Sequence, residues 1–107
     1  MTWARIGTFE VEQSSADQVV AFFKDEVTPL FAESPGFLGY QAFMDRESGR
    51  YVGISYWETR THLEGSAQSA KFALEKAASL GAVVIGSPAI AREEFDIRLQ
   101  DKGSPTG

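Results

Sequence analysis

The chain contains no cysteine and only one histidine, and it has no long hydrophobic run. Without cysteine it can form neither a disulfide nor a thiolate metal site, and the composition fits a cytoplasmic protein. No stretch approaches the roughly 18 apolar residues of a membrane span, and no N-terminal segment has the pattern of a signal peptide. We therefore expect a cytoplasmic protein that does not enter a membrane.

Basic residues are also scarce relative to acidic ones. Lysine and arginine number 10 against 15 for aspartate and glutamate, which gives a formal net charge of -5. Nucleic acids and anionic membranes bind basic patches, so the expected partners are small molecules or proteins. The length of 107 residues suits one domain. We expect this domain to span residues 1–99 and residues 100–107, rich in Gly, Ser, Pro and charge, to form a flexible tail.

Alternating apolar residues predict three strands, over residues 3–11, 37–44 and 51–57, and a last strand after Pro88. A five-residue loop that ends at Gly49 joins the second and third strands as a hairpin. Apolar residues fall on both faces of these strands, so neither face has the pattern of a solvent face. The segment 82–85 fits either a helix extension or a short extended piece.

Apolar residues at helical spacing predict one long helix that ends before Ser34. Ser15 and Gln18 form a possible capping box at its start. Pro29 lies inside the helix, where it removes a backbone hydrogen bond, so we expect a kink in the last turn.

Two further helices are predicted after the third strand. Thr61 and Glu64 suit the cap of a short helix through Ala67, and Ser69 suits the cap of a longer helix that ends at Gly81. The resulting order of elements is the ferredoxin-like split βαβ arrangement, an α+β fold with a four-stranded antiparallel sheet and both helices on one face. The other face would expose apolar side chains, so we expect a homodimer that buries it.

Three short motifs resemble the antibiotic biosynthesis monooxygenase family. They are a Pro-Gly-aromatic strand opening at residues 35–40, a Trp-Glu-Thr strand ending at residues 57–59, and the start of a long helix at residues 69–72. The resemblance extends in element order from Trp3 to about Leu99 and implies a dimeric α/β barrel. The family includes cofactor-free oxygenases that form quinones as well as haem degraders, so the motifs indicate the fold rather than one activity.

The residues that define the haem-degrading branch are missing. That branch has an Asn on the first strand, a Trp on the short helix and an axial His ligand on the long helix. Counted from Trp57, the second Trp would fall at Ser66 and the His near Lys76, and the chain has no Asn. Haem degradation is disfavoured without an axial ligand, and one histidine with no cysteine leaves no convincing site for another metal. We predict no cofactor and no metal.

Cofactor-free oxidation of a small aromatic substrate, of phenol, anthrone or hydroquinone type, is the activity that the resemblance still implies. Such a reaction needs an apolar pocket, a proton acceptor and a polar group that holds the substrate anion. Histidine is the one residue type that ordinarily titrates near neutrality, so His62 is the candidate catalytic base. The candidate substrate-binding residues are three aromatic side chains and two arginines that could hold a phenolate or enolate oxygen: Tyr40, Tyr56, Trp57, Arg5 and Arg60.

Each candidate also has a structural interpretation. His62 and Arg60 would be solvated, whereas Trp57 and the two tyrosines would pack in the core or a dimer interface. Arg5 would point inward, where an arginine usually needs a carboxylate or a ligand. The alternative function is therefore a noncatalytic ligand-binding or dimerisation module. A pocket that holds both His62 and Arg5 would favour the enzyme, and a filled helix-sheet interface would favour the module.

Overall fold

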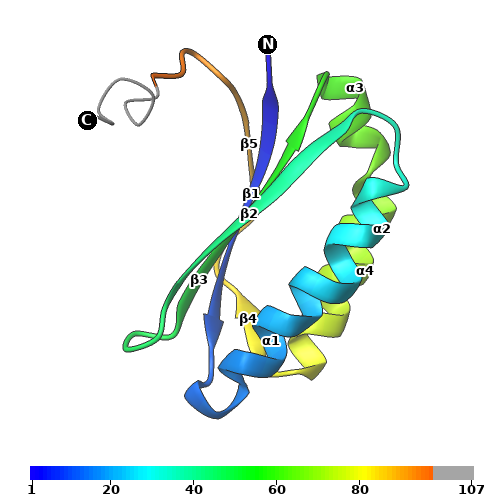
Figure 1. The fold of residues 1–107 in the computed structure, drawn as a ribbon. Helices are drawn as coiled ribbons and strands as arrows, with labels where there is room; N and C mark the ends of the chain where they lie inside the picture. The colour runs from blue at the N-terminus through cyan, green and yellow to red at the C-terminus, as the bar shows by residue number, and fades with distance from the viewer. Residues whose placement is uncertain (98–107) are drawn as a thin grey trace, which may run out of the picture.

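The computed structural model describes residues 1–97, so the predicted tail and the last two residues of the predicted domain lie outside the described residues. One antiparallel sheet of five strands is covered by helices on one face (Figure 1). This arrangement confirms the predicted ferredoxin-like α+β fold. The strands are β1 (Trp3–Val11), β2 (Phe37–Asp45), β3 (Arg50–Trp57), β4 (Ala82–Val84) and β5 (Ala89–Arg92), and their order is β2-β3-β1-β4, with β5 also paired to β1.

The prediction of four strands is wrong because the last edge strand is split in two. β4 pairs with residues 9–11 of β1, and β5 pairs with residues 3–6. Gly86, at a φ of +68°, and Pro88 lie between the two pieces. A left-handed glycine turns the chain, and proline has no N–H for the ladder. The predicted last strand after Pro88 is β5, which ends at Arg92. The segment 82–85, which fitted either a helix extension or an extended piece, contains the strand β4.

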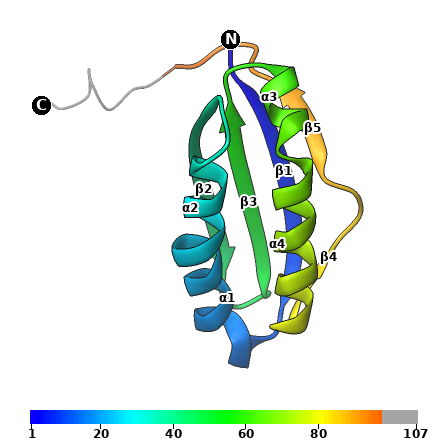
Figure 2. The ribbon, with the colours of Figure 1, turned by 90° about the vertical axis from the view of Figure 1, so that its right-hand side faces the viewer.

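Two helical rods lie side by side on the covered face of the sheet (Figure 2). No helix in the described part of the chain is long and apolar enough to cross a membrane. The first rod consists of a 3-10 turn (Gln13–Ser15), α1 (Ala16–Phe22), a π-helical segment (Phe23–Val27) and α2 (Thr28–Ala32), and the second consists of α3 (Arg60–Gly65) and α4 (Ala67–Ser79).

The irregularity expected at Pro29 takes the form of the π-helical turn that precedes it. The backbone N–H of Thr28 donates to the carbonyl of Phe23, and the Thr28 hydroxyl donates to the same oxygen at 2.9 Å. A spacing of five residues is the mark of a π turn. It places Pro29 in the first turn of α2, where a missing N–H costs little.

Of the three predicted helix caps, the first has the right position and the other two are misplaced. Ser15 is the residue before α1, as predicted, but its side chain makes no capping hydrogen bond. Thr59, not Thr61, caps α3, because its hydroxyl accepts a 3.1 Å hydrogen bond from the N–H three residues later. α4 begins directly after Ser66, which places Ser69 inside the helix. The end of β3 fixes where the chain can turn into α3, and the Ser/Thr spacing alone does not carry this information.

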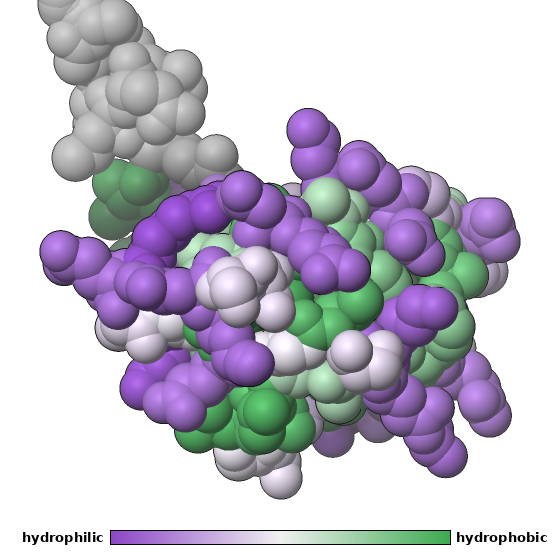
Figure 3. Space-filling view, turned by 90° about the horizontal axis from the view of Figure 1, so that it is seen from below, coloured by the Kyte–Doolittle hydropathy of each residue, from purple (hydrophilic) through white to green (hydrophobic). Residues whose placement is uncertain are grey.

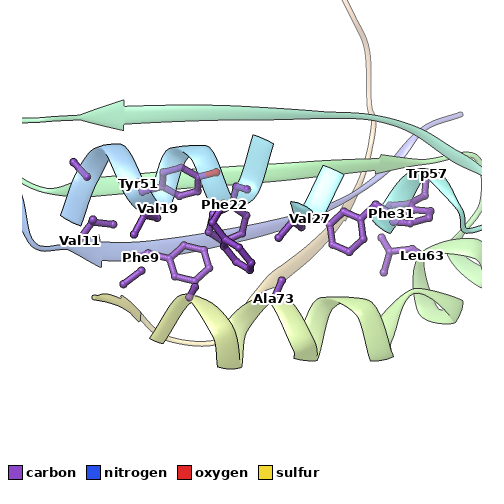
Figure 4. Packing of buried hydrophobic residues seen from close by; sticks show 14 residues of the cluster. Phe9, Val11, Val19, Phe22, Val27, Phe31, Tyr51, Trp57, Leu63 and Ala73 are labelled. Carbon is purple, nitrogen blue, oxygen red and sulfur yellow. The ribbon is translucent and has the colours of Figure 1, made fainter. Parts of the chain in front are cut away.

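The core lies between the sheet and the helices and is rich in aromatic rings (Figure 4). Near one end, Phe23 stacks on Tyr51 with 5.0 Å between ring centroids. Near the other end, Trp57 meets Phe31 edge to face at 5.8 Å and is fully buried. The Trp57 Nε1–H donates to the Ser55 hydroxyl at 2.9 Å. These contacts assign Trp57 a packing role in the core.

The opposite face of the sheet is left uncovered by the chain itself. Phe43 of β2 pairs with Val52 of β3 on this face, and Val83 of β4 lies there as the partner of Glu10. Phe43 is 55% exposed and Val83 64% exposed. The lower end of the molecule, where α1 begins, likewise shows apolar patches among hydrophilic residues (Figure 3). A single chain thus exposes large apolar side chains that a partner would cover.

Candidate functional site

A cleft opens between the helices and the middle of the sheet, beside β1 and β3. Its walls are apolar except for Arg5, Tyr40 and Ser55, and Gly7 and Gly53 line its floor. The cleft has a volume of about 50 Å³. This volume is well below the roughly 300 Å³ or more of ordinary ligand pockets, so a ligand with fused rings must also use the open mouth or displace side chains.

Arg5 is a half-buried cation on the wall of this cleft. Its Nη1 donates to Ser66 Oγ and its Nη2 donates to the Leu63 carbonyl, both at 2.9 Å. No carboxylate among residues 1–97 forms an ion pair with it. Burial lowers the pKa of the guanidinium, which nevertheless stays protonated at neutral pH. The cleft wall therefore carries a positive charge that attracts an anionic or electron-rich oxygen.

Tyr40 lines the same cleft from β2. Its hydroxyl lies 3.0 Å from the hydroxyl of Tyr51, and its ring is stacked on Phe23 at 6.1 Å and an interplanar angle of 2°. The hydroxyl fills the space over Gly53, where any Cβ would collide with it. Burial, with the neighbouring Tyr51, raises the pKa of Tyr40, and burial raises the pKa of Tyr51 to about 12. Both phenols are therefore neutral hydrogen-bonding groups at physiological pH.

Tyr56 lies on the other face of the sheet. Its hydroxyl donates to Gln41 Oε1 at 2.8 Å. Beside it runs a shallow groove of about 600 Å³, bordered by β2 and by Arg92 and Glu93 near the end of the described chain. This groove belongs to the uncovered sheet face and has no connection with the charge of Arg5.

His62 lies on α3 and does not line the cleft. Its Nδ1 is 2.9 Å from the Thr59 hydroxyl. The imidazole packs against Gly36, whose φ of +80° and missing side chain leave room for the ring. His62 was expected to be solvated if it had no catalytic role, but it is partly buried. Its position favours a structural role, in which the side chain holds the turn before β2 against α3.

Arg60 is likewise outside the cleft, on the exposed side of α3. It forms an ion pair of 3.1 Å with Glu64, and its guanidinium carbon lies 5.4 Å from the centre of the Trp3 ring. Of the six candidates, the structure brings two together at one cleft, Arg5 and Tyr40. It places the other four elsewhere: Tyr56, Trp57, Arg60 and His62.

Two residues that matter for the cleft were not among the candidates, Tyr51 and Ser66. The alternation of β3 puts Tyr51 on the same face as Gly53 and Trp57, and this pattern could have indicated its place behind the cleft. No sequence signal distinguishes Ser66, which is buried and accepts the hydrogen bond from Arg5.

The residues at the positions used by haem degraders do not fit a haem. Ser66 is buried and hydrogen-bonded to Arg5, and Lys76 is exposed on α4. Neither offers an axial ligand toward the cleft. The described residues also contain no group of three or more His, Asp or Glu side chains that could hold a metal ion.

Known relatives share the whole length of this chain. Residues 3–74 match the antibiotic biosynthesis monooxygenase family. The uncharacterised protein Rv2558 of Mycobacterium tuberculosis is 32% identical over 106 residues, which are 99% of this chain and 43% of that protein. Rv2557, also uncharacterised and from the same organism, is 26% identical over 107 residues, or 46% of its length. The chain thus spans less than half the length of these curated relatives.

Solved oxygenase structures have the same fold. The monooxygenase ActVA-Orf6 of Streptomyces coelicolor, in complex with nanaomycin D, has a TM-score of 0.69 and 20% identity, with 90% of each chain covered. A variant of SnoaB, a cofactor-independent oxygenase from Streptomyces nogalater, has a TM-score of 0.67 and 18% identity, with 90% of this chain and 96% of that chain covered. With the family match over residues 3–74, these likenesses lead to one conclusion: the chain belongs to the antibiotic biosynthesis monooxygenase family.

Proposed function

We propose that the protein is a cofactor-independent oxygenase that oxidises a small aromatic substrate of phenol, hydroquinone or anthrone type in the helix-sheet cleft. The observation that carries this proposal is Arg5, a half-buried cation on the cleft wall that no carboxylate of the described chain neutralises. Further support comes from the shared fold with SnoaB, a cofactor-independent oxygenase, and with ActVA-Orf6 in complex with nanaomycin D.

The positive charge of Arg5 would favour the ionised form of the substrate. A cation stabilises a phenolate or enolate more than the neutral parent, and partial exclusion of water strengthens this effect. The substrate would then lose its proton at a lower pH in the cleft than in water. None of the described residues that line the cleft is a base at neutral pH, so the proton would leave to water at the cleft mouth.

The anion is the species that can pass an electron directly to dioxygen. For an anthrone, one substrate and one dioxygen give one quinone and one water. The ring CH₂ group loses two hydrogens and gains one oxygen atom, and the second oxygen atom leaves as water with those hydrogens. The residues of the cleft would hold the anion, orient its ring and exclude bulk water from the intermediates.

We also propose that two copies associate through the uncovered sheet face. Phe43, Val83 and the neighbouring apolar side chains of β3 form a surface that no helix covers. A stable interface between two copies would bury on the order of 1,600 Å² in total. Each cleft would lie on the far side of its own sheet from the partner.

A noncatalytic ligand-binding module is the second candidate. The position of His62 outside the cleft favours a noncatalytic module, and the small cleft volume of about 50 Å³ favours the form of it that serves dimerisation rather than ligand binding. Measurement of oxygen uptake and quinone absorbance with an anthrone and a hydroquinone separates the two functions. The oxygenase forms quinone well above the spontaneous rate, whereas the module binds the aromatic compound and leaves its oxidation rate unchanged.

A further inference from the structure

The hydroxyl of Tyr51 has a single partner. Tyr51 is fully buried, and its only hydrogen-bonding partner among residues 1–97 is the hydroxyl of Tyr40, 3.0 Å away. Tyr40 is only partly buried and lines the cleft. The two phenols therefore form a chain of two groups that runs from the closed core to the cleft.

Either hydroxyl could be the donor in this hydrogen bond, and the burial of Tyr51 favours one direction. If Tyr40 donated to Tyr51, the Tyr51 hydrogen would have no acceptor in a dry part of the core, which is costly. If Tyr51 donates to Tyr40, its hydrogen is satisfied and the Tyr40 hydrogen is free. Because Tyr40 lines the cleft, this second arrangement turns a hydrogen-bond donor toward the ligand.

We infer that Tyr51 is a positioning residue that fixes the Tyr40 hydroxyl as a donor to the cleft and so selects ligands that place an acceptor oxygen there, either a phenolate or a quinone carbonyl. The inference rests on the proposed function, because the same cleft must bind the aromatic ligand. It adds a specificity element to that function: Tyr40 and Arg5 would both favour an acceptor oxygen over a bare hydrocarbon edge.

The packing around the two rings holds them in place. Phe23 stacks on Tyr40 at 6.1 Å and on Tyr51 at 5.0 Å, with interplanar angles of 2° and 29°. Gly53 leaves the space that the Tyr40 hydroxyl fills. Donation from Tyr51 also polarises the Tyr40 hydroxyl and makes it a better donor.

Binding of two matched probes tests the inference without any turnover. We would titrate the protein with 1,4-naphthoquinone and with naphthalene by calorimetry; the absence of cysteine prevents thiol adducts of the quinone. The wild type should bind the quinone about 10-fold more tightly than the hydrocarbon, the value of one good hydrogen bond. Tyr40→Phe should remove most of this preference and leave the part that Arg5 supplies, and Tyr51→Phe should reduce it about threefold through the lost polarisation.

A double-mutant cycle distinguishes positioning from a structural defect. In the Tyr40→Phe background, Tyr51→Phe should have no further effect on the preference for the quinone. The single variant Tyr51→Phe should bind naphthalene with the affinity of the wild type. Gly53→Ala, whose Cβ would collide with the Tyr40 hydroxyl and come within 3.2 Å of a Tyr51 ring carbon, should lose the preference as Tyr40→Phe does. It serves as the second variant if Tyr51→Phe folds poorly.

Each remaining outcome counts against a defined claim. An unchanged preference in Tyr51→Phe, or an equal loss in the Tyr40→Phe background, overturns the positioning role and leaves the oxygenase proposal standing. If the wild type binds neither probe, both the positioning role of Tyr51 and the oxygenase proposal are overturned. Oxidation of an anthrone by the wild type together with equal affinities for the two probes overturns the inference alone.

Discussion

The guanidinium of Arg5 donates a 2.9 Å hydrogen bond to the hydroxyl of Ser66 and so ties the first strand to the junction of α3 and α4. The same hydroxyl donates to the Leu63 carbonyl at 2.6 Å, and that carbonyl also accepts from Arg5. Arg5 therefore has two tasks: it holds the junction in place, and it puts a charge on the cleft wall. The two tasks can be separated by substitution on either side of the hydrogen bond.

Ser66→Ala removes the acceptor and keeps the charge. The variant should lower the free energy of unfolding by about 1–3 kcal/mol, because a buried hydrogen-bonded group loses its partner. Turnover of an anthrone should change by less than about threefold, since Leu63 still holds the guanidinium. Urea unfolding and initial rates measure both quantities. A large loss of activity at unchanged stability would mean that Ser66 touches the substrate.

His62→Ala tests the sequence-based prediction of a catalytic base. The loss of a general base typically costs about 100-fold or more in rate. Because His62 packs against Gly36 and does not line the cleft, we expect a change in turnover of less than about threefold. Steady-state oxygen uptake gives the result. A loss near 100-fold at wild-type stability would restore His62 as the proton acceptor.

Alkaline pH should destabilise the protein through the buried tyrosine pair. In the unfolded chain Tyr51 ionises near 10, whereas burial raises the pKa of Tyr51 to about 12 in the folded protein, and the pKa of Tyr40 is raised as well. Between about pH 10 and pH 12 the unfolded state releases protons that the folded state retains, so stability falls as the pH rises.

Urea unfolding at pH 8 and at pH 11, for the wild type and for Tyr51→Phe, isolates this contribution from that of other groups. The stability lost between the two pH values should be smaller in the variant, which has no hydroxyl to ionise at position 51. Equal losses in both proteins would show that Tyr51 titrates normally and is not held in a dry core.

A charge on the uncovered sheet face should break the proposed homodimer. Phe43→Glu places a carboxylate where a partner would bury an apolar ring, so sedimentation at micromolar concentration should change from dimer to monomer. Gln68→Glu adds the same charge at an exposed position of α4 and should remain dimeric. A wild type that sediments as a monomer would contradict the dimer and would leave the apolar face without its proposed partner.

The order of the strands and helices could be predicted because the hydrophobic period changes from two to helical spacing and back along the chain. The split of the last edge strand could not be predicted. Gly86 and Pro88 interrupt the pairing with β1, but the sequence does not indicate that pairing with β1 occurs on both sides of them. Two caps were misplaced because a Ser/Thr spacing recurs by chance within one turn of the true helix start. Thr59 caps α3 only because β3 ends two residues earlier.

The candidate site was predictable only in part, for a physical reason that differs between residues. The inward direction of Arg5 follows from the alternation of β1, and its place in the cleft agrees with that pattern. His62 was selected by its chemistry, and a residue type contains no information on where a helix will point it. The Tyr51–Tyr40 contact joins neighbouring strands, and it depends on the register and on the empty space over Gly53.

The most direct test of the oxygenase proposal is the rate of quinone formation from an anthrone across the pH range, with wild type, Arg5→Gln and Arg46→Gln. The proposal predicts catalysis well above the spontaneous rate and a fall in kcat/KM of about 100-fold in Arg5→Gln, as for other lost anion-stabilising donors. It also predicts that the rising limb of the pH profile moves up by about one pH unit or more, because the substrate anion loses its cation. Arg46, exposed in the hairpin and paired with Asp17, is the matched control and should behave as wild type. No rate above the spontaneous one, or equal rates and pH profiles for Arg5→Gln and wild type, would contradict it.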